Sequence, residues 1–141
     1  MSSKEESGRQ DRAWRAHRFA AEWAPTMARV LLGLVLAWFG YHELVAPGLW
    51  TGYVPGLAAA SPVATVLVLV HGWVLLVLAV AIVAGIALRL VAAIAALVVL
   101  QIVITLTVTG GLTDLTLRDV GILGLAICLT GSSRQRAALS G

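Results

Sequence analysis

Long apolar stretches, separated by short polar or glycine-rich connections, dominate the pattern along the chain. After a polar start, four such stretches cover residues 27–45, 63–87, 90–109 and 115–130. A helix needs about 20 residues to cross the hydrocarbon core of a bilayer, which is about 30 Å thick. The first three stretches reach this length, and local thinning of the bilayer would accommodate the shorter fourth. The pattern predicts an all-α integral membrane protein, a four-helix bundle over residues 26–131.

Local signals support the predicted helix boundaries. Ser61 followed by Pro62 is typical of a helix start, because serine caps the helix and proline suits its first turn. Thr116 with Asp119 three residues later resembles a capping box at the start of the fourth helix. Gly110 is expected to end the third helix.

The polar start is predicted to form an amphipathic interfacial helix over residues 8–24, with Trp14 and Trp23 as interfacial anchors. Pro25 is expected to end this helix and turn the chain. Residues 1–25 would then be a cytoplasmic amphipathic arm. The alternative is a solvated arm whose basic residues only retain this end of the chain in the cytoplasm.

Composition narrows the class of protein. The chain of 141 residues is 60% hydrophobic and 12% charged, with a mean hydropathy of +0.93, whereas soluble domains carry roughly 25% charged residues. This excludes a soluble enzyme, a nucleic-acid-binding module and a disordered tail. The single cysteine, Cys128, excludes an internal disulfide and a CxxC redox pair.

The basic residues predict the orientation in the membrane. Nine of the ten fall on one side of the predicted spans and only Arg118 falls on the other. Because Lys and Arg accumulate in cytoplasmic loops, both termini, including the tail 132–141, are expected in the cytoplasm of a multi-pass plasma (inner) membrane protein. The nine are Lys4, Arg9, Arg12, Arg15, Arg18, Arg29, Arg89, Arg134 and Arg136.

A few polar residues inside the spans are the candidate functional groups. With a rise of 1.5 Å per residue, all of them fall in the outer half of a core of about 30 Å. Small residues line the helix faces expected to pack, including Gly33, Gly40, Gly121 and Gly124. The bundle is therefore predicted to enclose an outward-facing polar pocket, with ligand or proton-relay candidates Glu43, His71, Asp119 and Gln101, and with His42, Thr105, Trp38 and Trp73 as further lining residues.

Glu43 and His71 are the sharpest pair among these candidates. If the two side chains meet, the carboxylate would hold the imidazole in one tautomer, as a proton relay or a hydrogen bond to a quinone requires. The structural alternative is that Glu43 and His42 cap the outer end of the first span and that His71 only bonds to a neighbouring helix. The spacing of the His and acidic residues does not indicate a metal site.

Three stretches resemble the DoxX family of four-helix membrane proteins. They are RVLLGLVLAWFGYHEL from Arg29, HGWVLLVLAVAIVAGIALRLVA from His71 and RDVGILGLAICLTG from Arg118, within a match over residues 29–131. The resemblance implies a four-helix bundle with both ends inside. Its known members include small subunits of quinol oxidase and thiosulfate:quinone oxidoreductase assemblies. Relatives often have an acidic residue where this chain has His71.

Three functions follow from the sequence and the resemblance. The first is a small membrane subunit of a quinone-linked redox assembly, with a quinone-like or lipid ligand in the outer pocket and a redox enzyme as partner. The second is a non-catalytic scaffold or assembly factor, and the third is a small-molecule permease, which would need a homo-oligomer. The sequence carries no motif for independent catalysis, so whether the chain is an enzyme stays open.

Overall fold

The computed structural model describes the backbone of residues 3–138 and the side chains of residues 14, 15, 18, 19 and 21–131. These residues form α1 (Ser3–Val45), α2 (Pro62–Ala84), α3 (Leu88–Gly110) and α4 (Asp114–Ala138), with two turns of 3-10 helix, η1 (Pro47–Leu49) and η2 (Thr51–Tyr53), between α1 and α2. No strand occurs in this part of the chain. The predicted all-α class is confirmed.

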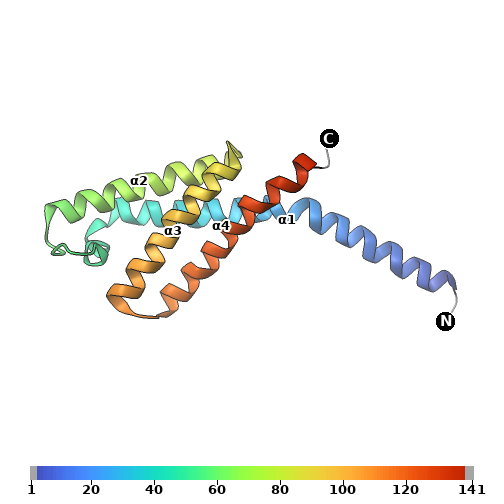
Figure 1. Cartoon of the computed structure of the whole chain (residues 1–141), viewed down its shortest axis with the longest axis horizontal. Coiled ribbons are helices and arrows are strands. Elements are labelled where there is room, and N and C mark those ends of the chain that lie inside the picture. Colours follow the sequence, from blue (N-terminus) through green and yellow to red (C-terminus); the bar gives the residue numbers. More distant parts are fainter. Residues whose placement is uncertain (1–2, 139–141) are drawn as a thin grey trace.

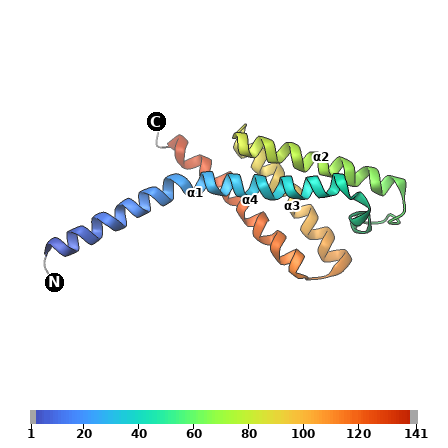
Figure 2. The ribbon, with the colours of Figure 1, turned by 180° about the vertical axis from the view of Figure 1, so that it is seen from behind.

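The helices are arranged as two hairpins. α1 packs along α2, and α3 packs along α4, whereas contacts between the two pairs are far fewer. Figures 1 and 2 show that the α3–α4 hairpin crosses the α1–α2 hairpin at an angle, so its connecting loop points away from the loop that joins α1 to α2. The hairpins are therefore close at one end and diverge at the other.

The hydrophobic core lies at the end where the two hairpins are close together. Leu32 of α1, Ile82 of α2 and Ala95 of α3 are fully buried there. Alanines recur at the buried positions of α3 and α4, which lets the hairpins approach closely without an aqueous hydrophobic effect between them. The core consists of Leu32, Leu36, Leu75, Leu78, Ala79, Ile82, Ala92, Ala95, Val99, Ala126 and Leu129.

Glycines allow α1 and α2 to touch backbone to backbone. A Cβ atom added at Gly40 would lie 2.7 Å from the carbonyl oxygen of Gly72, and one added at Gly72 would lie 3.0 Å from the carbonyl oxygen of Gly40. The predicted packing role therefore applies to Gly40. It does not apply to Gly121 or Gly124 of α4, where an added Cβ would meet nothing within 4 Å. Ala126, which is fully buried, faces the bundle instead.

Pro25 does not end the first helix, contrary to the expected break. It lies inside the continuous helix α1, because a proline removes only one backbone hydrogen bond and its ring bends a helix more readily than it stops one. Figure 2 shows the N-terminal part of α1 leaving the bundle in a different direction from the part that packs on α2. The predicted amphipathic character rests partly on residues 8–13, whose side chains lie outside the described ones. The side chains of Arg134 and Arg136 in the tail lie outside them as well.

Three segments among the described residues are long and apolar enough to cross a membrane: Ala21–Val45, Pro62–Ala84 and Leu88–Gly110. Large apolar side chains such as Leu34, Val77 and Leu97 are more than half exposed on their outer faces, as expected for helices surrounded by lipid. The apolar helices thus indicate a lipid environment. α4 is not among the candidate spans, since Asp114, Arg118 and Asp119 occupy its first two turns.

The turn between α2 and α3 is closed by Gly85, whose φ of +74° lies in the left-handed region that glycine adopts without strain. An added Cβ there would lie 2.8 Å from an Arg29 guanidinium nitrogen. Glycine thus lets the Arg29 cation approach the C-terminal end of α2, where the helix dipole is negative. The other predicted boundaries hold at Pro62 and Gly110, although the Ser61 side chain makes no capping hydrogen bond.

Candidate functional site: a cavity between the two hairpins

A cavity of about 680 Å³ lies where the hairpins diverge. All four α-helices and the loop between α1 and α2 contribute to its lining, which is mostly aliphatic and aromatic. Its volume is in the range of sites for small molecules and cofactors, roughly 300–1,000 Å³. The polar or ionisable side chains in the lining are Glu43, Trp50, Tyr53, His71, Gln101, Thr105, Arg118 and Asp119.

Glu43 and His71 meet in this cavity. Glu43 Oε2 lies 2.7 Å from His71 Nδ1, and their side chains are 8% and 27% exposed. Gly72 follows His71 in the chain, and the close approach of Gly40 and Gly72 brings the two helix backbones together at this level. A short contact between a buried carboxylate and an imidazole fixes the orientation of the ring. The pair therefore presents the other ring nitrogen, Nε2, in a defined position.

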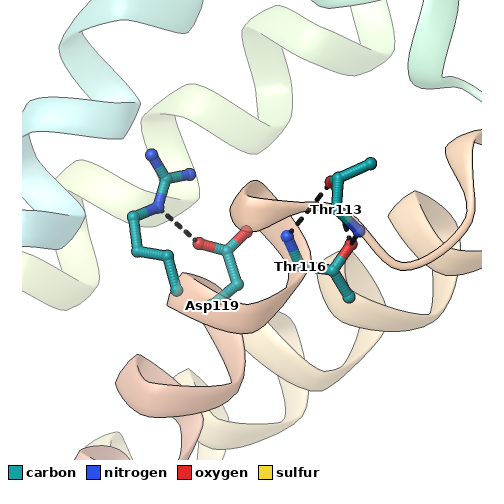
Figure 3. Close-up of polar contacts among 4 residues, drawn as sticks. Thr113, Thr116 and Asp119 are labelled. Carbon is teal, nitrogen blue, oxygen red and sulfur yellow. Dashed lines mark hydrogen bonds and ion pairs between the residues drawn. The ribbon is translucent and has the colours of Figure 1, made fainter.

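Asp119 is a second buried carboxylate in the same lining, and it is only 5% exposed. Arg118 Nε donates to Asp119 Oδ1 at 3.1 Å (Figure 3). The guanidinium carbon of Arg118 also lies 4.7 Å from the centre of the Phe39 ring, a cation–π distance. Arg118, the single basic residue predicted on the outer side of the spans, thus belongs to the cavity lining.

The start of α4 differs from the predicted capping box. Thr113, just before the helix, and Thr116 exchange long hydrogen bonds of 3.5 Å between each backbone nitrogen and the other side-chain oxygen. The Thr116 hydroxyl also donates to the carbonyl oxygen of Gly111 at 3.2 Å. Thr113 therefore plays the capping part assigned to Thr116 (Figure 3), and Asp119, paired with Arg118, lines the cavity. The helix consequently begins at Asp114, before the predicted start.

Gln101 and Thr105 form the polar stripe that α3 contributes to the cavity. Gln101 Nε2 donates to Thr105 Oγ1 at 3.3 Å, as side chains four residues apart on one helix face can. Both residues belong to the lining. The four ligand or proton-relay candidates from the sequence, together with Thr105, thus line one cavity.

Trp38, His42 and Trp73, predicted as lining residues, are absent from that lining. Trp38 and Trp73 are 64% and 62% exposed, and His42 Nδ1 lies 2.9 Å from the backbone oxygen of Trp38. Position 38 is rotated by about 140° from position 43 on a helix, and position 73 by about 200° from position 71. On an ideal helix these two tryptophans therefore face away from the cavity.

The loop 46–61 supplies a wall that the sequence interpretation missed. Trp50 and Tyr53 both line the cavity, and the Trp50 ring centre lies 6.1 Å from that of Phe39 in an edge-on arrangement. Thr51 is buried and donates to the carbonyl oxygen of Gly48 at 3.2 Å. The signal was present in the sequence: a connection of this length without any charge is more suited to folding onto apolar surface than to solvent.

Within the described residues, no group of three or more His, Cys, Asp or Glu side chains is arranged to hold a metal ion. The cavity instead combines one carboxylate–imidazole pair, one carboxylate–guanidinium pair and aromatic rings. In comparisons with known proteins, no family model, no curated protein and no solved structure matches this chain.

Proposed function

We propose that this chain is a DoxX-like membrane protein that binds a quinone in the cavity between its hairpins and serves as a small membrane subunit of a redox assembly. The observation that carries the proposal is the Glu43–His71 pair, held at 2.7 Å in the wall of a largely apolar cavity. Ionisable residues at membrane depth are rare and usually functional, because burying them in lipid costs a few kcal/mol. A redox enzyme as partner would supply the electron-carrying group.

The lining suits a flat ring with polar edges. Phe39 and Trp50 offer aromatic surface, against which a ring can stack or pack edge-on. Trp50 Nε1 and the guanidinium of Arg118 are hydrogen-bond donors in the lining, and a quinone carbonyl needs such donors. The isoprenoid tail of a quinone would leave the cavity between the diverging hairpins toward lipid.

The same proposal gives α4 as the fourth span and places both termini in the cytoplasm of the plasma membrane. Asp119 is buried, and Arg118, whose side chain is 45% exposed, is paired with Asp119 and lies against Phe39, so each charge has a partner in the cavity lining. An intramembrane charge is tolerated when it faces a cavity and is paired. The excess of basic residues beyond the inner ends of the helices supports the orientation.

Binding of quinone by the purified full chain tests this function. A decyl-substituted benzoquinone, titrated into the protein in phosphatidylcholine nanodiscs and followed by calorimetry against empty nanodiscs, should bind in a saturable manner. Replacing Glu43 with Gln should weaken binding about tenfold, or about 1.4 kcal/mol, because His71 loses its charged partner. His42→Gln is the matched control and should leave binding unchanged, because His42 lies outside the cavity. No saturable binding, together with no quinone co-purifying from native membranes, would refute the proposed function.

A further inference from the structure

Two polar atoms of the cavity wall lack a hydrogen-bond partner among the described residues although they are buried. They are His71 Nε2 and Trp50 Nε1, and both residues line the cavity. A buried polar atom without a partner destabilises the structure unless a ligand or water supplies the missing hydrogen bond. The pair of atoms therefore indicates what a ligand must supply.

The two atoms have opposite requirements. An indole nitrogen can only donate, so Trp50 Nε1 needs an acceptor. With Glu43 ionised, its carboxylate can only accept, so the proton between the two side chains belongs to His71 Nδ1. Nε2 of the neutral ring then carries no hydrogen and needs a donor. A hydroxyl group is the smallest ligand group that donates and accepts at once.

The charge of the lining restricts the ligand further. Glu43 and Asp119 each contribute a negative charge and Arg118 contributes a positive charge, which leaves a net charge of −1 with His71 neutral. Arg118 is already paired with Asp119. An anionic headgroup such as a carboxylate or phosphate would meet uncompensated negative charge in a medium of low dielectric constant.

We infer that the cavity selects a neutral amphiphile whose hydroxyl groups donate to His71 Nε2 and accept from Trp50 Nε1. This inference rests on the proposed function in that it uses the same cavity, but it specifies the hydrogen-bonding group of the ligand. The hydroxyl can belong to a hydroquinone ring or to a lipid alcohol such as a monoacylglycerol. A quinone carbonyl satisfies only Trp50 Nε1, so the oxidised ring should bind more weakly than the reduced one.

Four matched probes test the inference on the full chain in phosphatidylcholine nanodiscs: a decyl hydroquinone, its dimethyl ether, the corresponding quinone and a monoacylglycerol. Under anaerobic conditions, calorimetry should give a dissociation constant for the hydroquinone about tenfold lower than for its ether. In Trp50→Phe, which leaves the Glu43–His71 pair in place, the hydroquinone and its ether should both bind several-fold more weakly, because both accept from Trp50 Nε1, and the preference for the hydroquinone should remain. Trp73→Phe is the matched control, because Trp73 lies outside the cavity.

A spectroscopic measurement reports the proposed contact directly. The chain has three histidines, so ¹⁵N labelling of histidine with His71→Gln as the assignment control resolves His71 Nε2. Its resonance should move on addition of the hydroquinone and stay in place with the dimethyl ether. If His71 has only a structural role, neither probe should shift the His71 Nε2 resonance.

The outcomes separate this inference from the proposed function. Tighter binding of the hydroquinone than of the ether and the quinone supports both. Tight binding of the monoacylglycerol alone, with the His71 shift, supports the hydroxyl inference and refutes the quinone function. Equal binding of the hydroquinone, its ether and the quinone refutes the inference and leaves the quinone function standing, and no binding of any probe refutes both.

Discussion

Replacing His71 with leucine is expected to lower the free energy of unfolding by about 3 kcal/mol, because it leaves the buried Glu43 carboxylate without its partner. Removing the hydrogen-bond partner of a buried group costs roughly 1–3 kcal/mol, and more when the group left behind is charged. Titration of the micelle-solubilised protein with sodium dodecyl sulfate, followed by circular dichroism, measures the change.

The double replacement Glu43→Leu with His71→Leu should recover most of that loss, because the charge disappears together with its partner. His42→Leu provides a matched control on the same helix and should change stability by less than about 1 kcal/mol, since His42 contacts only the local backbone and its ring neighbours. If the double variant is as unstable as His71→Leu, the Glu43 charge is not what destabilises the single variant.

Replacing Gly40 with alanine is expected to lower the free energy of unfolding by about 1–3 kcal/mol. The new methyl group would lie 2.7 Å from the carbonyl oxygen of Gly72, so the backbones of α1 and α2 would have to separate. The same detergent titration measures this loss. Because Gly40 lies one turn from Glu43, the separation should also lengthen the Glu43–His71 contact.

Gly124→Ala is the matched control for that substitution. Nothing lies within 4 Å of an added Cβ at Gly124, and alanine in a helix interior is more stable than glycine by roughly 0.5–1 kcal/mol. Stability should therefore be unchanged or slightly higher. Equal losses at both positions would show that the close contact of α1 with α2 at Gly40 does not determine the effect.

The sequence predicted helix boundaries correctly where a residue has a strong preference for a helix terminus. Gly110 and Pro62 mark real boundaries, because each has a strong preference at a helix terminus. Pro25 was wrong as a boundary because the rest of its neighbourhood favours helix and the lost hydrogen bond is a small penalty over a helix of 43 residues. The cap of α4 was assigned to Thr116 and is Thr113, because two threonines fit the same local pattern.

The candidate site was predicted in part for a similar reason. Helical spacing from Gly40 pointed Glu43 toward the bundle, and depth placed His71 at a comparable level, so the pair could be anticipated. Depth alone does not give the rotation of a helix, and Trp38 and Trp73 were therefore assigned to the wrong face. The position of loop 46–61 depends on contacts with residues distant in the chain, such as Trp50 with Phe39, which local patterns do not encode.

The arrangement of the hairpins accounts for why the polar residues gather at one end. Small and branched apolar side chains close the bundle around Leu32, Ile82 and Ala95. Toward the other end the hairpins diverge (Figure 1), and the gap is lined by the few ionisable side chains of the spans.

Photolabelling tests the central claim, that a quinone binds between the hairpins, most directly. A photoreactive azidoquinone would be irradiated with the full chain in nanodiscs, and the labelled residues mapped by mass spectrometry. We expect labels on the cavity wall, in residues 49–55 and at Leu67, His71 and Leu75, that excess unlabelled quinone suppresses. Trp38 is exposed outside the cavity and serves as an internal control for labelling from lipid. Labels confined to such outward-facing residues and insensitive to competition would contradict the claim.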